Sequence, residues 1–222
     1  MLSQEEIKKL VGYKAAEFVK SGMAVGLGTG STAKYVVMAL GEKLGNDFSL
    51  QFGVPTSDAT RELAQEVGIE TREEPEVDHL DVTIDGADQI DIRTGLCIKG
   101  GGGAHYLEKK VAKKSDKLVI IVDESKLVDD FAGFNLPLEV EESQAESVAN
   151  ALVEKELEFE FRETKSDSGN LVCDVVFEGG DISEFAAEMM SIEGVLDTGL
   201  FENLATVIVI GRSNGEVEVV EL

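Results

Sequence analysis

MAVGLGTGSTAKYVVMALGEKLG, residues 23–45, predicts the local unit on which the fold is built. Met23–Leu27 is short and apolar, as is typical of a buried strand, and Gly28-Thr29-Gly30 ends it. We expect Ser31 to cap a helix that stops at Gly45. A strand followed directly by a helix is the repeating unit of parallel α/β sheets.

The same alternation continues through the first 125 residues. Ser3 and Glu6 fit a capping box, which predicts an N-terminal helix rather than a signal peptide. Its predicted apolar stripe is Ile7, Leu10, Val11, Phe18 and Val19. The further expected elements are strands 48–54, 81–84, 96–98 and 118–122 and helices 58–67 and 104–114, with Ser57 as an N-cap and Gly68 as a stop. We therefore predict an α/β fold with an open, mostly parallel sheet and helices on both faces.

The pattern changes near residue 130. The expected elements there are helices 143–156 and 182–191 and strands 158–163 and 171–177, with a turn at 167–170. They indicate a smaller inserted α+β domain, residues 131–204, which is a candidate oligomer contact. Strands 205–210 and 217–220 are expected to return to the main sheet, so that residues 1–130 and 205–222 form the catalytic domain.

Charge and composition restrict the classes of partner. The chain has 44 acidic and 20 basic residues, a net charge of −24, so we expect no nucleic-acid or membrane binding. The apolar runs are too short to span a bilayer. An acidic surface of this kind suits a salt-rich, halophilic cytoplasm, where ions screen self-repulsion. Cys97 and Cys173 lie in strand-like stretches and are expected to be buried thiols in a reducing cytoplasm.

The first candidate site motif is GLGTGST, residues 26–32. Its glycines allow close backbone approach, and the helix that follows offers unpaired N–H groups, so together they suit a phosphate. The motif is not a P-loop and lacks the third glycine of a dinucleotide fingerprint. The alternative is a tight strand–helix turn with a serine cap; the hydroxyls of Thr29, Ser31 and Thr32 favour a phosphate site.

The second motif is DGAD, Asp85 to Asp88, directly after a predicted strand. Two carboxylates at this spacing suit acid–base work on hydroxyl groups. A metal site is the less favoured interpretation, because the sequence shows no neighbouring histidine or third convergent carboxylate. An Asx-type turn that includes Asp91 is the structural alternative.

The third motif is KGGGGAHYLEKK, residues 99–110. Glycine N–H groups can surround an oxyanion while Lys99 supplies positive charge, and Glu108 can face back over the loop. Taken alone, Glu108 would more often be a helix-surface residue. His79 and His105 are interpreted as structural or surface residues.

These motifs together resemble the ribose-5-phosphate isomerase A family. The resemblance covers nearly the whole chain, in order and with compatible spacing. The segments that carry it are GLGTGSTA, TSDAT, IDGAD, IKGGGGA, EKKVA, VDESKLV, LPLEV and GLF. Where the family usually has apolar or small residues and then arginine before the catalytic glutamate, this chain has His105, Tyr106 and Leu107, and Gln89 replaces the usual acidic residue after DGAD.

The resemblance implies interconversion of D-ribose 5-phosphate and D-ribulose 5-phosphate through a cis-enediolate, in the non-oxidative branch of the pentose phosphate pathway. It implies a phosphorylated pentose as the small-molecule partner, no cofactor, no metal, and a homodimer or homotetramer. Glu108 would be the base, Lys99 would stabilise the oxyanion, and Asp85, with Asp88 as its alternative, would move the hydroxyl protons. The implied substrate-binding residues are Thr29, Gly30, Ser31, Thr32, Asp85, Gly86, Ala87, Asp88, Lys99, Gly100, Gly101, Gly102, Lys126 and Lys8.

Two other functions remain as alternatives from the sequence. A non-catalytic sugar-phosphate sensor would carry a DNA-binding module, which this acidic chain lacks at the sequence level. A coenzyme A transferase would use a glutamate as a covalent nucleophile, so that acyl-CoA would trap a thioester at Glu108. Turnover of a phosphopentose without coenzyme A would exclude this second alternative.

Overall fold

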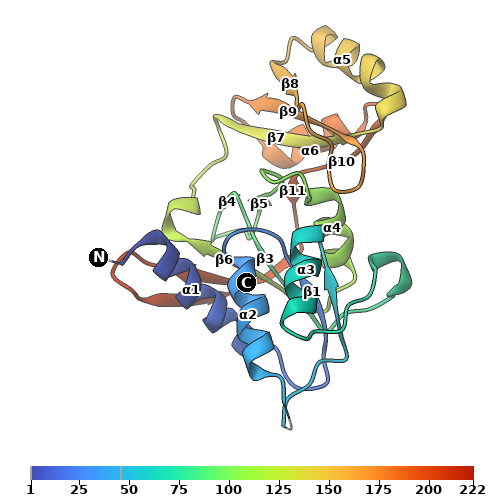
Figure 1. The fold of residues 1–222 in the computed structure, drawn as a ribbon. Helices are drawn as coiled ribbons and strands as arrows, with labels where there is room; N and C mark the ends of the chain where they lie inside the picture. The colour runs from blue at the N-terminus through green and yellow to red at the C-terminus, as the bar shows by residue number, and fades with distance from the viewer. Residues whose placement is uncertain (1, 46) are drawn as a thin grey trace.

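The computed structural model describes residues 2–45 and 47–222 and confirms the predicted α/β fold (Figure 1). A six-stranded main sheet has the order β13-β12-β6-β3-β1-β2, in which only the β12–β13 pair is antiparallel. Its strands are β1 (Ala24–Leu27), β2 (Phe52–Pro55), β3 (Val82–Gly86), β6 (Leu118–Asp123), β12 (Ala205–Gly211) and β13 (Val217–Glu221).

Helices cover both faces of this sheet. On one face, α1 (Gln4–Ala15), α2 (Ala33–Lys43) and α3 (Asp58–Glu66) contribute to a core that includes alternate residues of β1, β3 and β6. On the other face, α4 (His105–Lys113) packs with residues of β1, β2, β6 and β12. All six residues of β6 are consequently buried, as expected for a parallel strand with both faces covered.

Local sequence signals correctly predict where α1 and α3 begin. Ser3 and Glu6 form the predicted capping box, and the Ser57 side chain accepts a hydrogen bond from the Thr60 N–H at the start of α3. The Ser31 cap is a wrong prediction, because Thr32 is the N-cap of α2 and, among the residues described, its side chain makes no capping hydrogen bond. The predicted apolar stripe of the N-terminal helix is wrong at Leu10, which is 41% exposed.

The first part of one predicted strand is also wrong. Residues 48–54 were expected to form a single strand, but β2 begins only at Phe52. Phe48 instead forms an isolated antiparallel bridge with Gly45 beside the end of α2. The apolar residues before Phe52 pack against the core on the α1 and α2 side without joining the ladder.

A second, four-stranded sheet lies above the main sheet in Figure 1, with order β10-β7-β9-β8. It consists of β7 (Phe134–Val140), β8 (Phe159–Phe161), β9 (Leu171–Phe177) and β10 (Val195–Thr198), with α5 (Ala145–Glu154) and α6 (Ile182–Met190). The sequence did not predict β7, which contains Pro137, a residue disfavoured inside strands because it has no N–H. Pro137 lies one residue before the pairing with β10 begins at Leu138. The division at residues 130/131 and 204/205 stays a prediction.

A third sheet places two loops of the site. It is antiparallel, has the order β11-β5-β4, and is built from β4 (Gln89–Ile90), β5 (Cys97–Ile98) and β11 (Leu200–Phe201). The strand expected at 96–98 therefore exists but does not belong to the main parallel sheet. The described residues also include four short 3-10 helices: η1 (Ala16–Phe18), η2 (Glu74–Glu76), η3 (Glu124–Lys126) and η4 (Glu142–Gln144).

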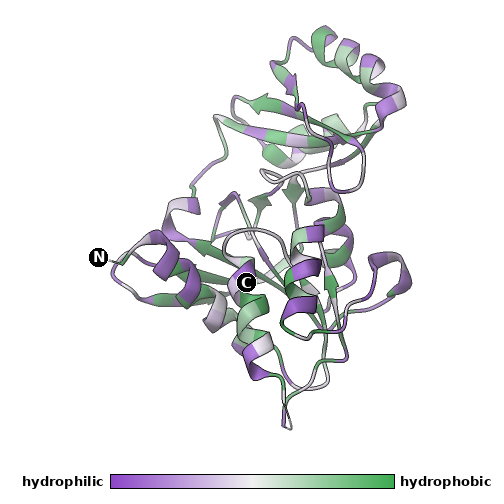
Figure 2. Ribbon diagram, viewed as in Figure 1, coloured by the Kyte–Doolittle hydropathy of each residue, from purple (hydrophilic) through white to green (hydrophobic). Residues whose placement is uncertain are grey.

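Hydrophobic residues dominate the strands in Figure 2, whereas hydrophilic residues are prominent on α1.

Cys97 and Cys173 are buried free thiols, as predicted. Within residues 2–45 and 47–222, no helix combines the length and apolar character needed to cross a bilayer.

Candidate active site

A cavity of about 240 Å³ lies at the carboxyl ends of β1, β3 and β6. This edge is where ligands bind in open parallel sheets, since loops from several strands converge there. Every predicted substrate-binding residue except Asp85 lines the cavity. The lining residues are Gln4, Lys8, Thr29, Gly30, Ser31, Thr32, Gly86, Ala87, Asp88, Lys99, Gly100, Gly101, Gly102, Glu108, Ile121, Val122, Asp123 and Lys126.

Three buried charged groups form one end of the site. Lys99 follows β5, Asp85 lies near the end of β3, and Glu108 lies in the first turn of α4. The Lys99 Nζ is 3.1 Å from Asp85 Oδ2 and 3.1 Å from Glu108 Oε2, and it also donates a hydrogen bond to the Gly86 carbonyl. Their exposed fractions are 3%, 1% and 5%. Glu108 is therefore not the helix-surface residue that its position alone suggested.

Burial and mutual charge change the proton affinities of this cluster. Loss of hydration raises the pKa of Glu108 to about 8, and repulsion from Asp85 acts in the same direction, while Lys99 opposes it. Burial also raises the pKa of Asp85 against the attraction of Lys99. For Lys99, burial lowers the pKa, but the charges of Asp85 and Glu108 outweigh it and hold the pKa above its ordinary value. Lys99 thus stays cationic between two carboxyl groups that retain protons unusually well.

Asp85 lies behind Lys99 and holds the neighbouring loop. Its Oδ1 accepts hydrogen bonds from the Thr29 N–H at 3.0 Å and the Gly86 N–H at 2.8 Å. A Cβ at Gly28 would stand 2.2 Å from the same oxygen, so only glycine fits there. The structure therefore places Asp88, rather than Asp85, at the cavity wall.

The segment TSDAT supports the same loop, a role that the sequence did not reveal. Thr56 Oγ1 lies 2.7 Å from Thr29 Oγ1, and the Thr60 hydroxyl donates to the Gly28 carbonyl at 3.0 Å. Both supporting threonines are buried, so their hydroxyls are positioned by packing and not by solvent. The loop after β1 is held on one side by Asp85 and on the other by these two threonines.

The glycine run after Lys99 makes close contacts at two positions. Gly100 has a φ of +118°, a conformation that favours glycine, and a Cβ there would be 2.9 Å from His105 Nδ1. The Gly101 N–H donates to Asp88 Oδ2 at 2.7 Å, and a Cβ at Gly101 would be 2.8 Å from Asp88 Oδ1. The Gly101 N–H, expected to face an oxyanion, therefore binds a carboxylate of the cavity wall.

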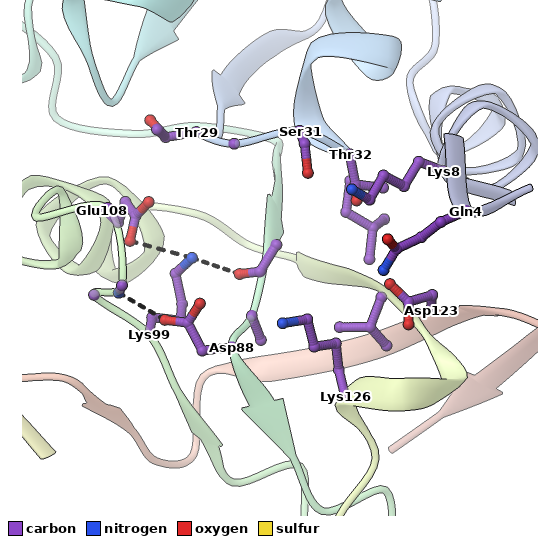
Figure 3. Close-up of a pocket in the computed structure, with 18 residues that line it drawn as sticks. Gln4, Lys8, Thr29, Ser31, Thr32, Asp88, Lys99, Glu108, Asp123 and Lys126 are labelled. Carbon is purple, nitrogen blue, oxygen red and sulfur yellow. Dashed lines mark hydrogen bonds and ion pairs between the residues drawn. The ribbon is translucent and has the colours of Figure 1, made fainter. Parts of the chain in front are cut away.

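Positive charge lies at the other end of the cavity. Figure 3 shows Lys8 and Gln4 of α1 with Thr32 on the side of the cavity away from Glu108 and Lys99, and Lys126 pointing into the middle of the cavity. The N-terminus of α2 opens at this end, where unpaired helical N–H groups favour anions. Lys8 and Lys126 therefore supply positive charge to the cavity of a strongly acidic chain.

Four lining residues were absent from the sequence prediction: Gln4, Ile121, Val122 and Asp123. Residues 121–123 are the last residues of β6. Ligands bind at the carboxyl ends of parallel strands, so the sequence could have predicted these three residues as part of the site. Gln4 had no such signal, because its place depends on how α1 packs on the face of the sheet. Within the described chain, no group of three or more His, Cys, Asp or Glu residues is arranged to hold a metal ion.

His105 is buried and His79 is exposed, which is compatible with the structural and surface roles predicted for them. His105 Nε2 lies 3.7 Å from Glu139 Oε2, beyond hydrogen-bond distance. Burial lowers the pKa of His105 to about 4, so its imidazole is neutral.

Comparisons with known proteins agree on one family. Residues 52–215 match the family model described as ribose 5-phosphate isomerase A (phosphoriboisomerase A). The chain is 41% identical to ribose-5-phosphate isomerase A of Lactiplantibacillus plantarum, with 99% of each chain covered. The solved ribose 5-phosphate isomerase A of Methanocaldococcus jannaschii has a TM-score of 0.90 and 34% identity, over 99% of this chain and 100% of that one. A D-ribose-5-phosphate isomerase solved in complex with phospho-erythronic acid has a TM-score of 0.91 and 33% identity, with both chains fully covered.

Proposed function

Because this chain belongs to the ribose 5-phosphate isomerase A family and is an aldose–ketose isomerase, we propose that it interconverts D-ribose 5-phosphate and D-ribulose 5-phosphate through a cis-enediolate. The reaction moves one proton between C2 and C1 and exchanges the carbonyl and hydroxyl groups. One base on one face of the substrate is sufficient for this transfer. The single observation that carries the proposal is the burial of Glu108 beside Lys99, on the side of the cavity away from Lys8.

Glu108 is the proposed base. Its carboxylate removes the C2 proton of the open-chain aldose, the C2–H electrons form the C1–C2 double bond, and the C1 carbonyl electron pair moves onto O1. A proton then passes from O2 to O1, the C2 carbonyl forms, and the C1–C2 double-bond electrons take the proton back from Glu108 at C1. A base works best when its pKa lies near the operating pH, and the raised pKa of Glu108 supports this role. Positioned acid–base catalysis contributes about 10²–10⁴-fold to the rate.

Lys99 is the proposed electrostatic partner of the developing negative charge. Its ammonium contacts Glu108 at 3.1 Å and lines the cavity, so it can reach the substrate oxygen nearest the base. Because the group is buried and fixed, it needs no reorganisation when charge develops. In the free enzyme the Lys99 ammonium is compensated by Asp85 and Glu108, and in the reaction it would also stabilise the negative charge on the enediolate oxygen.

Asp88 is the proposed carrier of hydroxyl protons and assists opening of the furanose ring. It lines the cavity, whereas Asp85 is covered by Lys99 and supports the loop at Thr29. Between the two carboxylates considered from the sequence, these positions favour Asp88 for contact with substrate. Asp85 would keep Lys99 charged and hold the loop after β1.

The phosphate is proposed to bind at Lys8, Lys126, Ser31 and Thr32, beside the N-terminus of α2. Binding energy at this remote end orients C1 and C2 against Glu108 and so contributes to turnover. An acidic molecular surface makes such a local cationic site necessary for an anionic substrate.

The test is formation of ribulose 5-phosphate from ribose 5-phosphate in concentrated KCl with EDTA. Wild type is compared with Glu108→Gln and with Glu74→Gln, a control whose side chain is 11% exposed and paired with Lys114. Turnover in wild type and the control, reduced at least about 10²-fold in Glu108→Gln, supports the proposal. Absence of turnover in folded wild type would contradict the reaction, and full activity of Glu108→Gln would contradict the base assignment.

Three further properties belong to the same proposal: a cytoplasmic location, a homodimeric or homotetrameric assembly, and adaptation to a salt-rich cytoplasm. The net charge of −24 supports the last of these. Light scattering gives the assembly state directly, and a monomer would contradict it. Equal activity and thermal stability in dilute buffer and concentrated KCl would contradict salt adaptation.

A further inference from the structure

One arginine from the second sheet contacts the glycine loop of the site. Arg162 directly follows β8, and its side chain is 22% exposed. Its guanidinium forms a two-pronged pair with Asp174, Nε to Oδ2 and Nη2 to Oδ1, both at 2.7 Å. The remaining nitrogen, Nη1, donates to the Gly100 carbonyl at 2.6 Å. Asp174 thereby fixes the plane of the guanidinium while Nη1 faces the loop.

The Gly100 carbonyl shares a peptide group with the Gly101 N–H. In a trans peptide the C=O and N–H point in opposite directions. The Gly101 N–H donates to Asp88 Oδ2 at 2.7 Å, the contact marked beside Asp88 in Figure 3. This one peptide group is thus bonded to Arg162 on one side and to the cavity-wall carboxylate on the other.

We propose that Arg162 is a positioning residue that holds Asp88 in place for hydroxyl proton transfer, acting through the Gly100–Gly101 peptide group. The inference rests on the proposed function, since it assigns Arg162 a part in the same isomerisation. Hydrogen bonds in series polarise one another, so a cation on the carbonyl makes the N–H a stronger donor to Asp88. The second sheet thereby acts on the chemistry without touching substrate.

An arginine is required by this geometry. Three of its nitrogens are used at once, two on a carboxylate and one on a carbonyl, within a single rigid plane. A lysine supplies a single flexible ammonium and cannot hold Asp174 and Gly100 in the same fixed arrangement. If Arg162 only joined the second sheet to the glycine loop, the effect of its substitution on kcat would not depend on Asp88.

A double-mutant cycle with Asp88 distinguishes these two roles. The variants are Arg162→Met, Arg162→Lys, Asp88→Asn and Arg162→Met with Asp88→Asn. Arg61→Met is the matched control, because Arg61 is 30% exposed and is likewise held by ion pairs, with Asp58 and Glu73. The readouts are kcat, KM, thermal unfolding, and protection of the Gly101 amide from hydrogen exchange. Asp174→Asn provides a milder change should Arg162→Met fail to fold.

Arg162→Met should lower kcat by at least about 10-fold. This loss is smaller than the 10²–10⁴-fold that positioned acid–base catalysis contributes, because Asp88 itself remains. The KM should change less than threefold, since the phosphate end is untouched. Arg162→Lys should recover part of kcat, and the Gly101 amide should lose protection in Arg162→Met. In the Asp88→Asn background, Arg162→Met should lower kcat by less than twofold, because its route of action is already lost.

A kcat of Arg162→Met within twofold of Arg61→Met would overturn the inference, as would an undiminished effect in the Asp88→Asn background. Inactive but folded wild type would contradict the proposed function instead. Gly101 amide protection then decides the inference without any substrate: unchanged protection in Arg162→Met overturns it, and lost protection supports the link from Arg162 to Asp88.

Discussion

The Lys99 ammonium lies 3.1 Å from the Glu108 carboxylate, with both side chains buried beside the cavity. The two residues come from different elements, β5 with its following loop and helix α4, so the fold and not the local sequence brings them together. Asp85 contacts Lys99 from β3 at the same distance. One buried cation thereby compensates two carboxyl groups, and its removal should affect both stability and catalysis.

Lys99→Met should lower the free energy of unfolding by about 3–5 kcal/mol at pH 8, because it leaves two buried carboxyl groups uncompensated. It should also lower kcat by on the order of 10²-fold, as loss of an oxyanion donor does. Urea unfolding and steady-state kinetics measure the two effects. Stability that is equal to wild type at pH 8 would show that Lys99 is not the compensating charge.

Activity and stability should respond to pH in opposite directions around Glu108. Its folded pKa of about 8 lies above the ordinary 4.5, so the folded state binds the proton more tightly than the unfolded chain. This contribution to stability is fully present below pH 4.5 and is lost as pH rises through about 8. The base form appears over the same range, so kcat/KM should rise while the free energy of unfolding falls.

Chemical unfolding at pH 6 and pH 9, with a pH profile of kcat/KM, checks this expectation. Glu108→Gln is the reference, because it lacks the titrating carboxyl and should lose less stability between the two values. A profile whose acidic limb lies at the ordinary carboxyl pKa of 4.5 would contradict the raised value.

Lys126→Met should raise the KM for ribose 5-phosphate by about 10-fold or more while lowering kcat far less, because Lys126 lines the cavity and is proposed to bind the phosphate. Lys155→Met is a suitable control, since Lys155 pairs with Glu188 on the second domain proposed here. Initial rates over a range of substrate concentration separate the two constants. A fall in kcat with unchanged KM would place Lys126 at the reacting carbons instead.

Gly101→Val should reduce turnover more than stability. Its Cβ would stand 2.8 Å from Asp88 Oδ1 and displace the carboxylate from the Gly101 N–H, whereas Gly101 itself is exposed. Gly45→Val is the control, because open space surrounds that Cβ position and Gly45 does not line the cavity. Thermal unfolding and kcat are compared for both; proportionate losses of stability and kcat in Gly101→Val would contradict a role in positioning Asp88.

Much of this site could be predicted because it lies at strand ends. The strand–loop–helix at residues 23–45 and the motif at Asp85–Asp88 place their polar groups at one sheet edge by topology alone. Motif resemblance supplied Lys8 and Lys126, whose nearness to that edge depends on how α1 and η3 pack.

Tertiary packing accounts for what the sequence did not predict. The burial of Glu108 follows from its contact with Lys99, which the spacing along the chain does not reveal. Strand β7 was missed because Pro137 argues against a strand, and the pairing of seven residues with β9 overrides that preference. Arg162 lies 62 residues from Gly100 and carries no local motif, so only the folded structure connects it with the loop.

The rate at which the covalent C–H bond at C2 is broken is the most direct test of the claim that Glu108 moves the proton. Ribose 5-phosphate carrying deuterium at C2 is incubated with wild type, Glu108→Gln and Glu74→Gln, and loss of deuterium from C2 is followed by NMR. The account predicts equal cleavage by wild type and Glu74→Gln, and cleavage slowed at least about 10²-fold in folded Glu108→Gln. Cleavage by Glu108→Gln as fast as by Glu74→Gln would contradict it.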